Sequence, residues 1–144
     1  MNGKLKILFL CTGNSCRSQM AEGWAKHLKG DIIYAYSAGV KPASVSSRAI
    51  AVMKEAGVDI SNHRSKHINE LLNIDFDYVV TVCDSAREQC PIFPRKVKTV
   101  HVGFDDPPIL SKEAKTEEEA LNIYRRVRDE IKMFVEKLLD NIHK

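Results

Sequence analysis

The sequence has no apolar run long enough to cross a membrane, and it has no strong excess of charge of one sign. Its 22 basic and 19 acidic residues leave a net charge of +3, which is too small and too dispersed to indicate nucleic-acid binding. The N-terminus leads directly into a strand pattern instead of a signal or transit peptide. We therefore expect a cytoplasmic protein without membrane or nucleic-acid partners, whose mild positive bias suits a small anionic substrate.

Cysteine is also scarce, and its spacing does not suit a zinc site. The sequence has four cysteines: Cys11, Cys16, Cys83 and Cys90. Neither pair is a Cys-x2-Cys, and no histidine stands at a matching interval, so a structural metal is not expected. Without a secretory signal, catalytic or redox roles are favoured over static disulfides. No cofactor is predicted from the residues alone.

No linker, repeat or low-complexity stretch interrupts the chain, so residues 1–144 are predicted to form a single domain. Strand and helix patterns alternate along it. Strands are predicted at residues 5–10, 31–37, 76–82 and 97–102, and helices at 19–29, 46–56, 69–72 and after the capping box that starts at Thr116. This alternation indicates an α/β fold, an open parallel four-stranded sheet with helices on both faces. The fourth strand is the weakest and is expected near an edge.

The most informative segment joins the first strand to the first helix and reads Cys-Thr-Gly-Asn-Ser-Cys-Arg-Ser over residues 11–18. A loop in this position aims backbone N–H groups and a helix N-terminus at one point, which suits a tetrahedral oxyanion. The same surroundings lower the pKa of a thiol, so Cys11 is predicted to be a nucleophilic thiolate. Arg17 adds a planar fork for two oxygens of the anion. The predicted oxyanion-binding residues are Thr12, Gly13, Asn14, Ser15, Cys16, Arg17 and Ser18.

Two other interpretations of this loop are weaker. A buried core position is the common fate of an isolated free cysteine, and a nucleotide-binding loop would need a Gly-Lys-Ser/Thr that does not follow here. The strand-to-helix junction favours the catalytic interpretation of Cys11. Ser18 is a candidate N-cap of the helix, and Cys16 is predicted to pack or to shape the loop.

Two more cysteines fall on the same edge of the predicted sheet. Cys83 directly follows the third strand, and Cys90 comes seven residues later. As an isolated pair they would be small apolar fillers. Beside a nucleophilic Cys11, however, they have another use. Thiolate exchange needs a second sulfur near the first, and repeated turnover often needs a third.

A pair of aspartates follows the fourth strand, again at the carboxyl edge where ligands bind in such sheets. Asp106 precedes Pro107 and is therefore held away from helical geometry. A carboxyl beside a bound oxyanion can stay protonated and donate to a leaving oxygen. We predict that Asp106, and not Asp105, is the general acid; the alternative is an ordinary turn aspartate.

The stretch from Cys11 to Ala25 resembles the thioredoxin-coupled arsenate reductases, which share the fold of the low-molecular-weight protein tyrosine phosphatases. The similarity continues through Tyr36–Gly39, Asp59–Asn62, Val80–Cys83, Cys90-Pro91, Gly103–Pro107 and Arg126–Glu130. The resemblance implies Cys11 as nucleophile, Arg17 as oxyanion clamp and Asp106 as general acid. It also implies that Cys83 and Cys90 form a redox relay. Arsenate would be the substrate, phosphate or sulfate its analogues, and thioredoxin the electron donor.

Family members bind a potassium ion beside the loop, and Asn14, Glu22 and Ser37 match three of its ligands. The fourth ligand is an aspartate, but this chain has Arg-Ser-Lys at residues 64–66. No metal is therefore assigned, and the Lys66 ammonium is predicted to lie near the three matching residues and to make activity insensitive to potassium.

Two rival functions remain open at this point. A tyrosine phosphatase would use the same Cys11, Arg17 and Asp106, with water resolving the phosphocysteine. It would not need Cys83 or Cys90, and the Asp-Pro here lacks the following aromatic residue of that family. The second rival is a non-catalytic oxyanion-binding or redox-sensing protein. Nothing in the sequence indicates more than a monomer.

Overall fold

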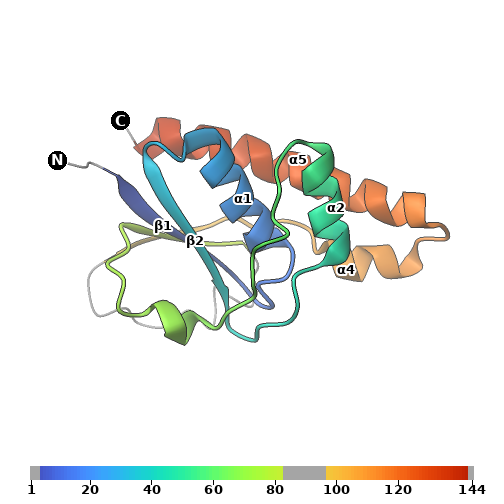
Figure 1. The fold of residues 1–144 in the computed structure, drawn as a ribbon, viewed down its shortest axis with the longest axis horizontal. Helices are drawn as coiled ribbons and strands as arrows, with labels where there is room; N and C mark the ends of the chain where they lie inside the picture. Colours follow the sequence, from blue (N-terminus) through green and yellow to red (C-terminus); the bar gives the residue numbers. More distant parts are fainter. Residues whose placement is uncertain (1–3, 83–96, 143–144) are drawn as a thin grey trace.

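A sheet of four parallel strands carries the predicted site at its carboxyl edge (Figure 1). The computed structural model describes residues 4–82 and 97–142, with side chains described up to residue 138. The strands are β1 (Leu5–Cys11), β2 (Ile33–Gly39), β3 (Tyr78–Thr81) and β4 (Lys98–His101), in the order β2-β1-β3-β4. The predicted open parallel α/β sheet is confirmed, and β4 lies at the edge as expected. The predicted relay residues Cys83 and Cys90 lie outside the described residues.

β1 is buried in the centre of the sheet because its side chains are apolar on both faces. Ile7 to Leu10 are fully buried, and β1 pairs in parallel with β2 on one side and β3 on the other. Leu10 is in register with Thr81, and Thr81 with His101. The segments that follow β1, β3 and β4 therefore start at the same edge of the sheet.

Helices pack against this sheet, and the last of them, α5, leads to the C-terminal end of the chain (Figure 1). They are α1 (Arg17–Lys29), α2 (Ser47–Glu55), α4 (Pro107–Leu110) and α5 (Glu117–Ile142), with 3₁₀ turns η1 (Ile68–Leu71) and η2 (Ser111–Glu113). α1 packs against β1, β2 and α5. None of the helices in the described ranges is both long and apolar enough to span a membrane.

The long helix α5 starts at the predicted cap. The hydroxyl of Thr116 accepts a hydrogen bond from the N–H of Glu119, whereas the Glu119 carboxylate reaches the N–H of Lys115 and not that of Thr116. Apolar residues at three- and four-residue steps predict a core face for this helix, and four of them, Ala120, Val127, Ile131 and Leu138, are buried. Ile123 and Phe134 are only half-buried, and their neighbours Tyr124 and Val135 take the core positions instead.

The structure differs from the sequence prediction in two places that bear on the site. α1 begins at Arg17, its N-cap is Cys16 without a side-chain cap, and Ser18 lies inside the helix. The prediction of Ser18 as N-cap is therefore wrong, because its hydroxyl is engaged by Cys11 and Asn14. The short α4 was not predicted; its two leading prolines are compatible with a first helical turn, where a backbone N–H is not needed.

Candidate active site

The sulfur of Cys11 lies at the end of β1, where two groups can donate to it. Cys11 is 3% exposed, and its Sγ accepts a hydrogen bond from the N–H of Asn14 at 3.2 Å. The hydroxyl oxygen of Ser18 lies 2.7 Å from the same sulfur and accepts a hydrogen bond from the side-chain amide of Asn14 at 2.8 Å. Because Asn14 donates to Ser18, the hydroxyl proton of Ser18 is available for the sulfur. Donors to a charged form favour it, so the geometry suits a thiolate.

The backbone of Asn14 has a φ of 49°, the left-handed conformation that asparagine adopts more readily than most residues. Several hydrogen bonds fix it in that conformation. Its side-chain oxygen accepts from the N–H of Lys66 at 3.0 Å. Its carbonyl oxygen accepts from the amide of Gln19 at 3.0 Å and from the hydroxyl of Ser65 at 2.7 Å. Strained backbone of this kind persists only where its surroundings over-determine it.

The carbonyl oxygens of the loop are tied away from the sulfur by the segment that follows β2. The bonds run from Lys41 N to Thr12 O, from Ala43 N to Gly13 O, and from Ser46 N to Ser15 O, each at 2.8 Å. In a trans peptide the C=O and the following N–H point in opposite directions. The N–H groups of Gly13, Asn14 and Cys16 therefore point away from residues 41–46, which is the arrangement that an oxyanion needs.

Gly39 makes this close packing of the loop against β2 feasible. A Cβ at Gly39 would lie 2.6 Å from the carbonyl oxygen of Thr12 and 2.9 Å from the backbone nitrogen of Asn14. Any side chain there would push the loop away from its hydrogen-bonding segment. Gly39, the last residue of β2, thus helps to set the shape of the loop.

Arg17 joins the loop to the segment that carries the two aspartates. Its Nη1 donates to the carbonyl oxygen of Phe104 at 3.0 Å, and its Nη2 lies 3.3 Å from the carboxylate of Asp106. Asp105 points elsewhere, because its carboxylate is bound by Arg126 of α5 at 3.0 Å. The structure therefore brings Asp106, and not Asp105, to the guanidinium beside the loop.

Cys16 is buried under the loop and is poorly suited to chemistry. It is 3% exposed, and burial is the main reason why the pKa of its thiol is raised far above the ordinary value. The neighbouring Cys11 raises it further, and Asp106 adds a smaller effect of the same sign. A thiol that stays protonated is neither a nucleophile nor a metal ligand.

The residues that match the potassium ligands do not form an ion site. Ser37 donates a hydrogen bond to the buried carboxylate of Glu22, and the ammonium of Lys26 contacts the same carboxylate. The side chain of Asn14 is engaged by Ser18 and by the Lys66 N–H. Within residues 4–82 and 97–142 no three His, Cys, Asp or Glu side chains gather as metal ligands. The oxygens that match the potassium ligands are therefore already engaged by hydrogen-bond donors or acceptors of this chain.

The Lys66 ammonium forms its hydrogen bond away from the three matching side chains, and its effect on potassium dependence stays a prediction. The ammonium donates to the carbonyl oxygen of Arg64 at 3.1 Å, and only the backbone N–H of Lys66 reaches Asn14. Partial burial is the largest cause that lowers its pKa, while Glu22 acts in the opposite direction. The ammonium in contact with Glu22 is that of Lys26, which lies one helical turn after Glu22 in α1.

We expect enzyme activity to change by less than about twofold when potassium replaces sodium at constant ionic strength, because an ammonium already neutralises Glu22. The reaction rate would be measured over a range of potassium concentrations. The matched variant is Lys26→Met, which removes that ammonium and should make the rate more sensitive to potassium. A large, saturable activation of the unmodified protein by potassium would contradict this expectation.

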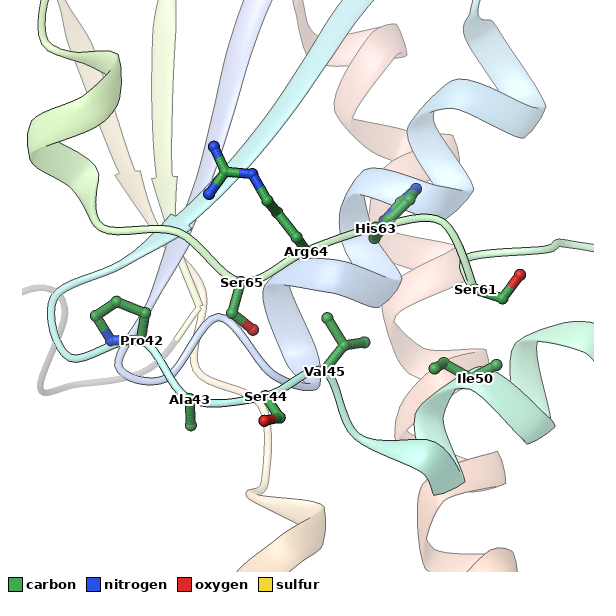
Figure 2. Close-up of a pocket in the computed structure, with 9 residues that line it drawn as sticks. All are labelled: Pro42, Ala43, Ser44, Val45, Ile50, Ser61, His63, Arg64 and Ser65. Carbon is green, nitrogen blue, oxygen red and sulfur yellow. The ribbon is translucent and has the colours of Figure 1, made fainter.

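A cavity lies behind the loop, between the two segments that hold it (Figure 2). Its volume is about 630 Å³, and it is lined by Pro42, Ala43, Ser44, Val45, Ile50, Ser61, His63, Arg64 and Ser65. Of the predicted catalytic residues that the structure describes, Cys11, Arg17 and Asp106, none lines it. A second hollow of about 530 Å³ borders the loop, since Ser15 and Pro108 of α4 are among its walls, but Cys11, Arg17 and Asp106 do not line it.

Two residues that hold the loop were missed by the sequence prediction. Gln19 is fully buried at the start of α1, and Ser65 lies in the segment before η1. The signal for Gln19 was a polar residue beside apolar ones at the start of a buried helix. For Ser65 there was no such signal, because its contact with Asn14 spans 51 positions.

Comparison of the sequence with known proteins identifies the family of this chain. Residues 6–144 match the family described as low molecular weight phosphotyrosine protein phosphatase, and the chain belongs to it. It is 49% identical over 133 residues to "Arsenate reductase 2" of Staphylococcus epidermidis, covering 92% of this chain and 95% of that one. It is 50% identical over 125 residues to the arsenate reductase of Bacillus subtilis, covering 87% and 88%.

Solved structures resemble the fold as closely. One, described as an arsenate reductase in the phosphate binding state, has a TM-score of 0.76 at 33% identity and covers 96% of this chain and 98% of that one. A low molecular weight protein tyrosine phosphatase from T. tengcongensis has the same TM-score at 30% identity, covering 96% and 99%. The fold is thus shared by relatives that bear the names of two different activities.

Proposed function

We propose that this chain reduces arsenate to arsenite, with Cys11 as nucleophile and with Cys83 and Cys90 as a disulfide relay that thioredoxin regenerates. The observation that carries the proposal is the arrangement around one sulfur: Cys11 has two donors and lies in a loop whose carbonyl oxygens are tied to residues 41–46, and Arg17 at the end of that loop pairs with Asp106. Relatives about half identical to this chain are named arsenate reductases. The enzyme would act as a cytoplasmic monomer, in a compartment where thiols are kept reduced.

The first step is an exchange of anions at Arg17. Without substrate its fork holds the carboxylate of Asp106. An arsenate in the loop would accept hydrogen bonds from the N–H groups of the loop and would replace Asp106 at the Nη2 of Arg17. A guanidinium binds a tetrahedral oxyanion through two oxygens, which is stronger than its contact with the single carboxylate oxygen of Asp106. Asp106 then stands beside a bound anion, whose negative charge favours the protonated carboxyl.

The second step is attack of the Cys11 thiolate on arsenic. The sulfur–arsenic bond forms while one arsenic–oxygen bond breaks, and the leaving oxygen departs as water with the proton of Asp106. Arsenic remains in its pentavalent state, because no electron pair has yet moved to it. The donors from Asn14 and Ser18 stabilise the thiolate before the attack.

The third step moves two electrons to arsenic. The Cys83 thiolate attacks the sulfur of Cys11, a sulfur–sulfur bond forms, and the electron pair of the sulfur–arsenic bond goes to arsenic, which leaves as arsenite. Cys90 then attacks Cys83 and frees Cys11. The dithiol of thioredoxin reduces the resulting Cys83–Cys90 disulfide by the same exchange chemistry.

A single turnover without reductant tests this account. Fully reduced protein mixed with excess arsenate should form about one arsenite per chain, because each chain holds one relay. Its thiol titre should fall from four to two. Arsenite would be counted by chromatography and thiols by a colorimetric reagent. A constant thiol titre without arsenite would contradict the proposal.

Hydrolysis of phosphate monoesters is the second candidate function. It is favoured by the hollow of about 530 Å³ beside Ser15 and Pro108, which could take the organic part of an ester. Phosphate and arsenate have the same shape and charge, so the loop would hold either one. An assay with an aryl phosphate, run beside the arsenate assay, separates the two functions.

Asp106→Asn is expected to slow arsenite formation about a hundredfold, the loss typical of a missing general acid. Asp105→Asn is the matched control, since it makes the same change one position away on a carboxylate that faces α5. Its effect should be much smaller. Single-turnover rates at saturating arsenate would be compared, and equal losses in the two variants would contradict the assignment of the acid.

A further inference from the structure

Side-chain contacts hold the segment between β4 and α4 at three points, and two of them lie outside the oxyanion loop. Arg17 binds the carbonyl oxygen of Phe104 and the carboxylate of Asp106. The ring of Phe104 packs edge-on against that of Phe134 in α5, with 5.9 Å between centroids. Arg126 of α5 binds the carboxylate of Asp105 at 3.0 Å.

The first of these points must weaken when substrate binds. The Nη2 of Arg17 cannot serve both the carboxylate of Asp106 and an oxyanion at full strength, since both are anions that compete for one donor. Asp106 then loses its ion pair at the stage when its position matters most. The contact that keeps Asp106 over the leaving oxygen must therefore be one that does not involve Arg17.

Arg126 makes such a contact, because it binds the neighbouring Asp105 from α5. Its Nη1 donates to the carboxylate of Glu130 at 3.0 Å, one turn further along α5. This bond leaves the Nη2 to bind Asp105 in the segment between β4 and α4. The backbone at Asp106 is extended, with φ −91° and ψ 101°. In extended backbone, successive side chains point to opposite sides. Holding Asp105 against α5 therefore directs Asp106 away from α5 and toward Arg17.

We infer that Arg126 is a positioning residue of the reaction, which keeps Asp106 over the bound oxyanion after Arg17 has turned to the substrate. This inference rests on the proposed function, because it acts through the assigned acid. The pair itself adds little to folding stability, since Arg126 is 45% and Asp105 61% exposed in their side chains. Its effect should therefore appear in the rate and not in the free energy of unfolding.

The test compares three variants of α5 in single turnovers with the full reduced chain. Arg126→Gln should lower the rate of arsenite formation at saturating arsenate about fivefold, with little change in the half-saturating arsenate concentration. Arg126→Lys, which keeps the charge, should recover most of that loss. Arg125→Gln is the matched control: the neighbouring Arg125 binds Glu55 and Glu118, away from the acid, so the rate should not change.

The decisive readout is dependence on the acid. In a protein that already carries Asp106→Asn, Arg126→Gln should cause no further loss, whereas a merely structural role would add its full effect. An additive loss, or an unchanged rate in Arg126→Gln alone, overturns the inference while leaving the proposed function intact. If Asp106→Asn is itself as fast as the unmodified protein, the assignment of the acid fails and the inference fails with it.

Discussion

Replacement of Cys11 by serine is expected to abolish arsenate reduction and any phosphate ester hydrolysis. A serine hydroxyl is a far weaker nucleophile than a thiolate at neutral pH, and the donors from Asn14 and Ser18 stabilise a thiolate, not a neutral hydroxyl. Arsenite formation would be followed by chromatography over many hours, with a detection limit of about a thousandth of the parent rate.

Oxyanion binding should survive in the same variant, because Arg17 and the N–H groups of the loop remain. Titration calorimetry with inorganic phosphate provides this control, together with a thermal unfolding curve that shows an intact fold. A serine variant that binds phosphate and still produces arsenite would refute the central role of Cys11. A cysteine that merely packs in the core would leave the rate unchanged when replaced.

Replacement of Cys83 or Cys90 by serine is expected to remove multiple-turnover arsenate reduction and to leave phosphate ester hydrolysis as it is in the parent. The two variants should also differ from each other. Without Cys83 no electron pair reaches arsenic, so not even one arsenite per chain should form. Without Cys90 a single arsenite should form, and the protein should stop as a Cys11–Cys83 disulfide.

Mass spectrometry of peptides identifies that disulfide, and the counted arsenite gives the stoichiometry. Loss of phosphate ester hydrolysis together with arsenate reduction would show that the relay assignment is wrong or that the substitution damages the fold. Continued turnover of the Cys90→Ser variant with thioredoxin would show that Cys90 is not needed to resolve the first disulfide.

The sequence predicted the fold well because its strongest signals are local. A continuous apolar run predicts the buried β1, and the change to helical spacing after Arg17 predicts α1. The cap at Thr116 set the start of α5 through contacts of three and four positions. The predicted loop has the expected place between β1 and α1, and Arg17 lies beside Asp106.

The sequence prediction failed where side-chain direction depends on distant parts of the chain. Ser18 stands where an N-cap is plausible, but the sulfur of Cys11 and the amide of Asn14 engage its hydroxyl instead. The Lys66 ammonium was expected to lie near Asn14, Glu22 and Ser37. Its hydrogen bond goes to the carbonyl oxygen of Arg64, and Lys26 is in contact with Glu22 because it lies one helical turn from that carboxylate.

The distinction between the two adjacent aspartates has the same origin. The Asp-Pro rule favours Asp106 in the sequence. The structure adds that Arg126, 21 positions away, holds Asp105 against α5. No local pattern contains that information, and it becomes visible only when the segment after β4 is placed against α5.

Sustained arsenite production with thioredoxin tests the central claim most directly. Catalytic amounts of the protein would be mixed with arsenate, thioredoxin, thioredoxin reductase and NADPH, and arsenite would be counted against protein over time. The account predicts arsenite far beyond one equivalent, one NADPH oxidised for each arsenite, and a stop after about one equivalent when thioredoxin is left out. Absence of arsenite above the enzyme-free control, while an aryl phosphate is hydrolysed at the same Cys11, would contradict it.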